Sequence, residues 1–495
     1  MLRSQYNTCM TTLLLILCSI FLYVTPYLNF ELFFLSWFFF IPIIFLLERG
    51  KISPVRLGLI FGIASNLIAT YWVSPTISNL TGAGLGLATS VHLLYSIYES
   101  IFFILVFLLV TLSLKKIKNI WFKYIFIIFI YVIFEQNFPR IFPYKLGNSQ
   151  IIFTEISQLI SILGINIISI LVLIFNICLY EILFKKKIDV LYILIGIFLL
   201  AFYSGRFLEN NFQNNFQKVS QIKIALIQPV NSLKEIIKIQ KEINLENHQY
   251  DIIVWPESSL NKINLKRKED YKEFQDAFYR NFKFNSKYLL LGSIIENDNG
   301  YFNSAILINS EYKIQDLYSK NKLMIFGEFY PLKNILSTIM PIYREFVELK
   351  RGEIKVVKTA GGLILGIVIC YEDLFEDNAA QLAQLNSEIL INLTNGKWYG
   401  DTLATYQHLM LAIPRAIENR RFLVRSTYNG VSAIISPKGE IINKIPKNKV
   451  GYISNNVSLI RAKSFYSIYK SQIKMIYHVI FGVLLILFLI KLRNK

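Results

Sequence analysis

Residues 366–373 read Gly-Ile-Val-Ile-Cys-Tyr-Glu-Asp, an apolar run that ends on Cys370 and turns acidic at once. Branched aliphatic residues bounded by a polar turn predict a buried strand. If Asp373 caps a following helix, the backbone N–H groups just after Cys370 are suited to bind an anion. The same pattern fits a core cysteine that precedes a capped helix. A strand that delivers a thiol into a turn is expected in either case.

Around this run, residues 206–473 alternate short apolar segments with amphipathic ones. Strands are expected at 222–227, 252–255, 288–294, 304–308, 363–369, 389–393, 422–426 and 431–435, and helices near 232–247, 267–282, 374–386 and 402–420. Strands that alternate with helices predict sheets covered by helices. Residues 206–473 are therefore expected to form an α/β domain.

The flanking sequence is far more apolar. Hydrophobic residues make up 54% of the chain and charged residues 17%, a balance that leaves too much apolar surface for a fold facing only water. Apolar segments long enough to cross a bilayer are found at 11–27, 30–47, 55–75, 88–112, 119–135, 160–182, 188–205 and 474–491. We therefore expect a membrane domain of seven transmembrane helices at 1–205, the α/β domain at 206–473, and a last transmembrane helix with a short tail at 474–495.

Basic residues alternate from one inter-span loop to the next. They follow the second, fourth, sixth and last spans, for example at Arg49, Lys116, Lys186 and Arg493, and are nearly absent from the other short loops. Loops rich in lysine and arginine stay in the cytoplasm. Both termini are therefore expected in the cytoplasm, with residues 206–473 on the opposite side of the membrane.

The formal charge of +19 is not gathered into a basic patch interleaved with aromatic residues, so nucleic acid is not expected as a partner. The four histidines are scattered and form no cluster with cysteine, so we expect no metal site. Cys370 is the one cysteine of the polar domain and has no disulfide partner there. An isolated thiol in such a domain is a candidate nucleophile.

Two other polar residues follow apolar segments of the same domain. Glu257 comes after Val254-Trp255-Pro256, and Lys320 lies in Tyr318-Ser319-Lys320. By themselves they also fit a turn glutamate on the surface and one more solvated lysine. Together with Cys370 they form a workable catalytic set, because a carboxylate in a dry site can act as base and a nearby ammonium group favours a thiolate and an oxyanion. No histidine within thirty residues of Cys370 offers the usual alternative base.

Several longer segments carry a family resemblance. They are WPES at 255–258, YSKNKL at 318–323, FGEFYPL at 326–332, ICYED at 369–373 and TNGKWYG at 394–400. The order Glu257, Lys320, Cys370 resembles the nitrilase superfamily, and the apolar spans make the whole chain similar to its membrane-bound branch, the apolipoprotein N-acyltransferases. The resemblance implies an extracytoplasmic α-β-β-α sandwich attached to a polytopic α-helical membrane domain.

The resemblance also implies roles for single residues. Cys370 would attack a phospholipid ester and form a thioester, Glu257 would be the general base, and Lys320 would stabilise the oxyanion. The supporting residues would be Glu328, Tyr371 and Glu372. Trp398 would lie on a mobile loop near the site.

The partners implied by the resemblance are all lipid-linked. The acyl donor would be a phospholipid, and the acceptor would be the N-terminal α-amine of an S-diacylglyceryl-cysteine apolipoprotein. No cofactor is implied, and we expect a monomer in the bacterial inner membrane, with the catalytic domain in the periplasm.

The apolar run Met324-Ile325-Phe326 and residues 339–343 fit equally well as lipid-contacting arms or as ordinary core. Two other functions use parts of the same pattern. A membrane-tethered amidase would hydrolyse the thioester with water, although a soluble amide needs no such anchor. A transporter would use charges within the spans, such as Glu99 and Glu181, but it would not need the Glu-Lys-Cys set.

Overall fold

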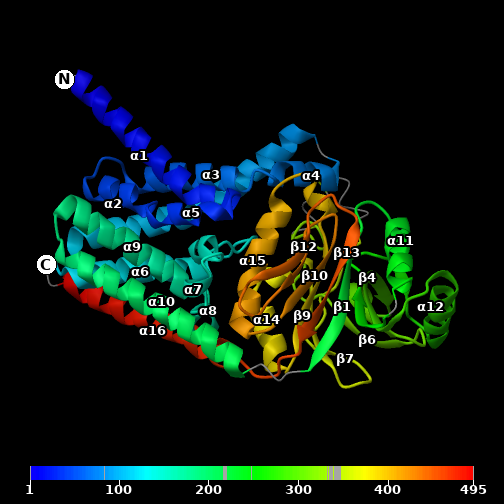
Figure 1. The fold of residues 1–495 in the computed structure, drawn as a ribbon. Coiled ribbons are helices and arrows are strands. Elements are labelled where there is room, and N and C mark those ends of the chain that lie inside the picture. The colour runs from blue at the N-terminus through cyan, green and yellow to red at the C-terminus, as the bar shows by residue number, and fades with distance from the viewer. Residues whose placement is uncertain are drawn as a thin grey trace. The chain divides into compact units, whose positions relative to one another are not determined.

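The computed structural model describes residues 2–82, 84–215, 220–246, 248–331, 333, 338 and 347–493. The chain divides into two compact units (Figure 1). Unit 1 comprises Met1–Phe212 and Tyr469–Lys495, and unit 2 comprises Gln213–Ile468.

Unit 1 is helical. Its elements are α1 (Leu2–Leu28), η1 (Phe30–Trp37), α2 (Phe40–Glu48), α3 (Pro54–Ala69), α4 (Val73–Thr81), α5 (Leu85–Lys116), α6 (Ile120–Asn137), η2 (Leu146–Gln150), α7 (Thr154–Ser157), α8 (Ile160–Leu163), α9 (Asn166–Lys185), α10 (Asp189–Asn215) and α16 (Phe465–Arg493). Among the described residues, seven helical segments are long and apolar enough to cross a membrane, or eight if α3 and α4, bent by 60°, form one span.

Some helices differ in extent from the predicted apolar ranges. α10 continues past 205 to Asn215, and α16 starts at Phe465 rather than near 474. These extensions are polar or amphipathic, so hydropathy does not mark them although they remain helical. The range 160–182 is divided at Gly164, whose φ of 72° and ψ of 178° end α8 before α9 begins. This backbone conformation is one that glycine adopts without a steric cost.

The charge inside the fourth predicted span is paired. Glu99 lies 3.3 Å from the guanidinium of Arg140, and both side chains are almost fully buried. The guanidinium of Arg140 also lies over the ring of Phe102, 4.3 Å from its centroid. A buried charge needs such a partner, and the pair connects α5 to the segment that follows α6.

Unit 2 contains two mixed sheets. The first has the order β13-β1-β2-β4-β5-β6, with β3 paired to β4, and the second has the order β12-β11-β10-β9-β8-β7. The strands of the first sheet are β1 (Gln221–Gln228), β2 (Tyr250–Val254), β3 (Ile263–Asn264), β4 (Ser286–Asn297), β5 (Gly300–Asn309), β6 (Ile314–Ser319) and β13 (Gly451–Ser458). Those of the second sheet are β7 (Val357–Lys358), β8 (Ile364–Ile369), β9 (Ile389–Asn395), β10 (Leu423–Tyr428), β11 (Ser432–Ile435) and β12 (Ile441–Ile445).

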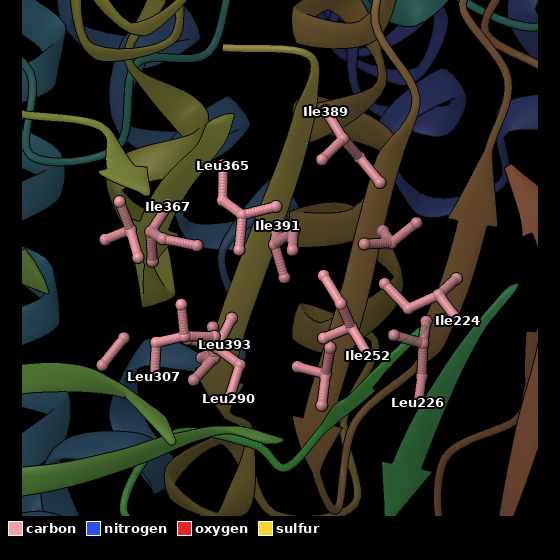
Figure 2. Close-up of a cluster of buried hydrophobic side chains, with 14 of the residues drawn as sticks. Ile224, Leu226, Ile252, Leu290, Leu307, Leu365, Ile367, Ile389, Ile391 and Leu393 are labelled. Atoms are coloured by element: carbon pink, nitrogen blue, oxygen red, sulfur yellow. The ribbon is translucent and has the colours of Figure 1, made fainter. Parts of the chain in front are cut away.

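The two sheets pack face to face through branched aliphatic side chains (Figure 2). Ile224, Ile252 and Leu290 from the first sheet share this core with Ile367 and Ile391 from the second. Strand side chains alternate between faces, and the residues between these positions pack outward against helices. The longer helices of unit 2 are α11 (Leu233–Asn244), α12 (Lys268–Asn281), α14 (Glu376–Gln384) and α15 (Ala404–Asn419).

These helices complete the outer layers. Buried residues of α11 and α12 share a cluster with the outer face of the first sheet, while α14 and α15 pack on the second (Figure 1). The predicted fold class, apolar helices joined to an α-β-β-α sandwich, is confirmed. Among the described strands, β3, β6, β7, β12 and β13 were not predicted, because they are very short or interrupted by polar residues and owe their structure to pairing with neighbours.

The turn after β2 lies directly on β4. A methyl group added at Gly292 would come within 2.6 Å of Glu257 Cα and 2.8 Å of the Pro256 carbonyl oxygen. We expect Gly292→Ala to push this turn away and to destabilise unit 2 by about 1–3 kcal/mol. Thermal unfolding of the full-length protein in detergent measures the effect as a lower Tm.

Gly451→Ala is the matched control, because Gly451 lies in β13 of the same sheet and a methyl group there would meet nothing within 4 Å. Equal losses of stability in the two variants would contradict the steric account.

Candidate active site

Three strand ends from the two sheets bring together the predicted triad. Glu257 follows β2 after a two-residue turn, Lys320 follows β6 directly, and Cys370 follows β8 directly. β2 and β8 each run parallel to their sheet neighbours β4 and β9, so Glu257 and Cys370 lie at the carboxyl ends of parallel strands. Such ends are common places for ligand sites in α/β sheets.

Lys320 lies at the centre of the buried charges. Its side chain is 1% exposed, and its Nζ lies 2.9 Å from Glu328 Oε2 and 3.8 Å from Glu257 Oε1. Burial favours the neutral amine, but the charges of Glu328, Cys370 and Glu257 outweigh it and hold the pKa of Lys320 well above its usual value. The ammonium form is therefore stable in this site.

Asn303, on β5, joins the two glutamates. Its Nδ2 donates to Glu257 Oε1 at 2.6 Å and to Glu328 Oε1 at 2.7 Å. The backbone N–H of Asn395 donates to Glu257 Oε2 at 2.7 Å. These bonds fix the Glu257 carboxylate in one orientation relative to Lys320.

The pKa of Glu257 is raised, because burial disfavours its charge and Glu328 adds repulsion, while Lys320 and the hydrogen bonds from Asn303 and Asn395 oppose this rise. A carboxylate with a raised pKa is a stronger base than one in water. The geometry and the pKa thus both suit Glu257 to accept a proton.

Cys370 begins a short 3-10 turn, η4 (Cys370–Leu374), and has an unusual backbone conformation. Its φ is +54°, in the left-handed region that residues with side chains seldom adopt. Asn392 Nδ2 donates to the Cys370 carbonyl oxygen at 2.8 Å and helps to hold this conformation. The residue as a whole is half-buried. Burial and Glu257 raise the pKa of the Cys370 thiol, whereas the charge of Lys320 lowers it.

Glu372 lies beneath the turn. Its carboxylate accepts hydrogen bonds from the backbone N–H groups of Asn321, Lys322 and Ile369 at 2.7, 2.9 and 2.8 Å, and from the hydroxyl of Tyr318. Burial raises the pKa of Glu372 to about 7, although these backbone donors oppose the rise. Glu372 therefore ties the segment after Lys320 to the end of β8 that carries Cys370.

Tyr371 makes a second connection between the same segments. Its hydroxyl donates to the Leu323 carbonyl oxygen at 2.7 Å, and the Lys320 ammonium lies 5.5 Å from its ring centroid. An ammonium group is attracted to an aromatic face at this range.

The expected helix cap at Asp373 is wrong. α14 begins at Glu376, its N-cap residue is Phe375, and no side chain caps it. Asp373 is buried and accepts a hydrogen bond from the Arg425 guanidinium and, at 2.7 Å, from His408 Nε2. An ion pair with residues distant in sequence has replaced the local cap. His408 thus comes near the turn but is bonded to Asp373.

Two exposed aromatic side chains lie on segments that also contact the triad. Phe326 is 47% exposed, and Met324 and Ile325 beside it are half-buried. The N–H of Met324 donates to Glu328 Oε2 at 2.7 Å, so this segment is anchored to the charge cluster. Trp398 is 46% exposed and comes soon after Asn395. Residues 339–343 lie outside the described residues.

Sequence reasoning missed the three asparagines of the site, Asn303, Asn392 and Asn395. Asn303 lies on β5, next to the strand that precedes Lys320, and Asn392 and Asn395 lie on β9, next to the strand that precedes Cys370. The one sequence signal that could have found them is their place on strands adjacent to those that carry the predicted residues. Asparagine is common throughout this chain, so its type carried no information. Within the part of the chain that the structure describes, no group of three or more His, Cys, Asp or Glu residues is placed to hold a metal ion.

The charges around Cys370 predict that two substitutions change its alkylation rate in opposite directions. Lys320→Met removes the cation that favours the thiolate, so alkylation of Cys370 by iodoacetamide at about pH 8 should become slower by about tenfold or more. Glu257→Gln removes a negative charge beside the thiol, so alkylation should become faster. The rates are measured by mass spectrometry of the peptide that carries Cys370.

Lys322→Met is the control, because the Lys322 ammonium lies over the Phe375 ring and not in the charge cluster. Faster alkylation in both Lys320→Met and Glu257→Gln would mean that these changes merely open the site.

Two family models match the chain in succession. Residues 19–178 match the apolipoprotein N-acyltransferase N-terminal domain, and residues 220–465 match the carbon-nitrogen hydrolase family. Among solved structures, Saccharomyces cerevisiae Nit3, a member of branch 10 of the nitrilase superfamily, aligns with a TM-score of 0.37 and 18% identity over 51% of this chain and 95% of its own.

Curated relatives extend over both units. The apolipoprotein N-acyltransferase of Wigglesworthia glossinidia brevipalpis is 28% identical over 81% of this chain and 82% of its own. The apolipoprotein N-acyltransferase of Rickettsia prowazekii is 28% identical over 84% of this chain and 87% of its own. Apolipoprotein N-acyltransferase 2 of Treponema denticola is 35% identical over 47% of this chain and 46% of its own. With a matching N-terminal domain, a matching hydrolase domain and relatives aligned across both, the chain belongs to the apolipoprotein N-acyltransferase family.

Proposed function

We propose that the protein transfers an acyl chain from a membrane phospholipid to the N-terminal α-amine of S-diacylglyceryl-cysteine apolipoproteins, through a thioester on Cys370. The observation that carries the proposal is the buried cluster in which the Lys320 ammonium lies within 3.8 Å of the Glu257 and Glu328 carboxylates, all three close enough to act on the Cys370 thiol. The names of the relatives support an acyltransferase that acts on apolipoproteins.

In the first half-reaction, Glu257 takes the proton of the Cys370 thiol as the sulfur attacks the ester carbonyl of the phospholipid. The developing oxyanion is stabilised by the ammonium group of Lys320. The ester C–O bond then breaks, and the lysophospholipid alkoxide leaves with the proton from Glu257. The product on the enzyme is a thioester of Cys370.

In the second half-reaction, the α-amine of the apolipoprotein attacks the thioester carbonyl and loses a proton to Glu257. The C–S bond breaks, the amide is released, and the thiolate of Cys370 is reprotonated from Glu257. The lysophospholipid leaves before the apolipoprotein reacts, so the kinetics are ping-pong.

Three further residues support these steps without touching the reacting atoms. Glu328 shares Lys320 with Glu257 and keeps the ammonium in place. Glu372 and Tyr371 hold the turn of Cys370 against the segment that follows Lys320.

The half-exposed stretch Met324-Ile325-Phe326 and the exposed ring of Trp398 are the proposed contacts for acyl chains. Aromatic and aliphatic side chains exposed beside a reactive thiol favour an apolar substrate. No cofactor is needed for either half-reaction, and the protein is proposed to act as a monomer.

The proposed location is the bacterial inner membrane. Long apolar helices in unit 1 support membrane insertion, and the lysines after predicted even-numbered spans support cytoplasmic termini. Residues 206–473 would then lie in the periplasm, where the tethered site can reach lipid-anchored substrates.

The thioester is directly testable by intact-mass analysis. After incubation with phospholipid, wild-type protein should gain one acyl mass that hydroxylamine removes, and Cys370→Ser should gain none. Glu257→Gln should slow the gain by about 10²- to 10⁴-fold, because it removes the general base.

Glu311→Gln is the matched control, since Glu311 is an exposed glutamate of unit 2 whose carboxylate pairs with Lys313 at 2.8 Å. A wild-type protein that stays unmodified with phospholipid would overturn the mechanism. Release of free fatty acid in place of an N-acylated lipopeptide would identify a hydrolase.

The orientation is tested by labelling intact cells with a membrane-impermeant maleimide after the four natural cysteines have been replaced by serine. Leu245→Cys in unit 2 should react from outside the inner membrane, because Leu245 is 83% exposed. Lys51→Cys, in the loop after the second predicted span, should react only after lysis. The reverse pattern would show that the orientation is inverted.

A further inference from the structure

A cavity of about 350 Å³ lies within unit 1, between α6, α9 and α10. Its walls are mainly isoleucine side chains: Ile125, Ile128, Ile174, Ile177, Ile193 and Ile197. The three helices are neighbours in the fold (Figure 1). The volume falls in the range of pockets that hold small ligands.

The cavity is part of a packed arrangement. α9 and α10 contact each other through Cys178, Val190 and Leu194, which are all buried. The space therefore lies beside a well-formed helix contact. Water does not fill an apolar cavity, and an empty one leaves its lining atoms without contacts. An apolar chain is the occupant that suits these walls.

The charged groups lie at one end only, where α9 turns into α10. Glu181 and Tyr124 line this end, and the Tyr124 hydroxyl donates to Glu181. Lys187 Nζ lies 3.2 Å from Glu181 Oε2, and its side chain is 43% exposed while that of Glu181 is 4% exposed. The ammonium group is thus held over the mouth of the cavity with donors left over for a ligand.

Lysines and carboxylates both surround the mouth. Lys185, Lys186 and Lys187 are consecutive, and Lys185 is paired with Glu48 at 2.8 Å. Asp189 also lines the mouth. Lys187 is the cation of this lining, and its remaining N–H groups can donate to the phosphate of a lipid headgroup.

We propose that this cavity binds one resident phospholipid, with an acyl chain among the isoleucines and the headgroup phosphate accepting hydrogen bonds from Lys187. The site is separate from the proposed acyl-donor site, because all of its lining residues belong to unit 1 whereas Glu257, Lys320 and Cys370 belong to unit 2. The lipid fills the space between α6, α9 and α10 and stabilises their packing. This inference does not depend on the proposed function.

Native mass spectrometry of the full-length protein, delipidated in detergent, tests the proposal. Phosphatidylglycerol and phosphatidylethanolamine should each bind tightly with one lipid molecule per protein molecule, since both carry the phosphate. Diacylglycerol with the same chains should bind at least about tenfold more weakly, because it cannot pair with the ammonium group. Equal binding of diacylglycerol would overturn the role of the phosphate.

Two matched pairs of variants locate the site. Lys187→Gln should weaken binding about tenfold, and Lys186→Gln, its exposed neighbour, should not. Ile193→Trp should fill the cavity and abolish the tight equivalent, whereas Ile195→Trp, on α10 but outside the cavity lining, should leave it intact. Thermal unfolding of each variant checks that it is folded.

If both members of a pair behave alike, the tight lipid does not occupy this cavity and the proposal fails. Formation of the Cys370 thioester is measured on the same samples. Tight lipid binding without a thioester would support this site and contradict the proposed function. A thioester without tight lipid binding would support the proposed function and contradict this site.

Discussion

A charged ammonium group buried inside a protein requires negative partners, and this requirement organises the candidate site. Lys320 is 1% exposed, so its charge is compensated by Glu257 and Glu328 rather than by water. Two carboxylates so close would repel each other without the cation. The amide of Asn303 donates to both and sets the distance between them. The positions of Glu257, Lys320 and Glu328 are therefore coupled through these contacts.

The same cluster depends on the way that the two sheets are joined. Lys320 belongs to the first sheet and Cys370 to the second, so the packing of the sheets decides whether they meet. The aliphatic core between the sheets fixes their separation, and the Glu372 carboxylate binds backbone N–H groups from both. The buried pair of Asp373 with Arg425 then holds the other end of the turn. The left-handed backbone at Cys370 persists because these contacts surround it.

The proposed acyl-enzyme would form in the same way for either acceptor. Neither the base nor the cation distinguishes an amine from water, so the choice of acceptor in the proposed reaction must come from its surroundings. Exposed apolar side chains beside the triad and the apolar helices of unit 1 both favour substrates that carry lipid chains. The proposed resident lipid extends this view, because a phospholipid would then be a structural component of unit 1 as well as the proposed acyl donor.

Hydropathy and local pattern were enough to predict the apolar helices, the α/β domain and three residues at strand ends, because these features follow from periodicity along the chain. The edge strands β6, β7, β12 and β13 were missed, since pairing with a neighbouring strand, more than their own composition, makes them strands. The helix cap expected at Asp373 failed for a related reason: Arg425, 52 residues away, and His408 offered it stronger partners than the local backbone. The tertiary structure alone placed Asn303 between two glutamates and Glu372 between two sheets. Contacts between distant segments depend on how the sheets pack, and local sequence patterns do not predict that packing.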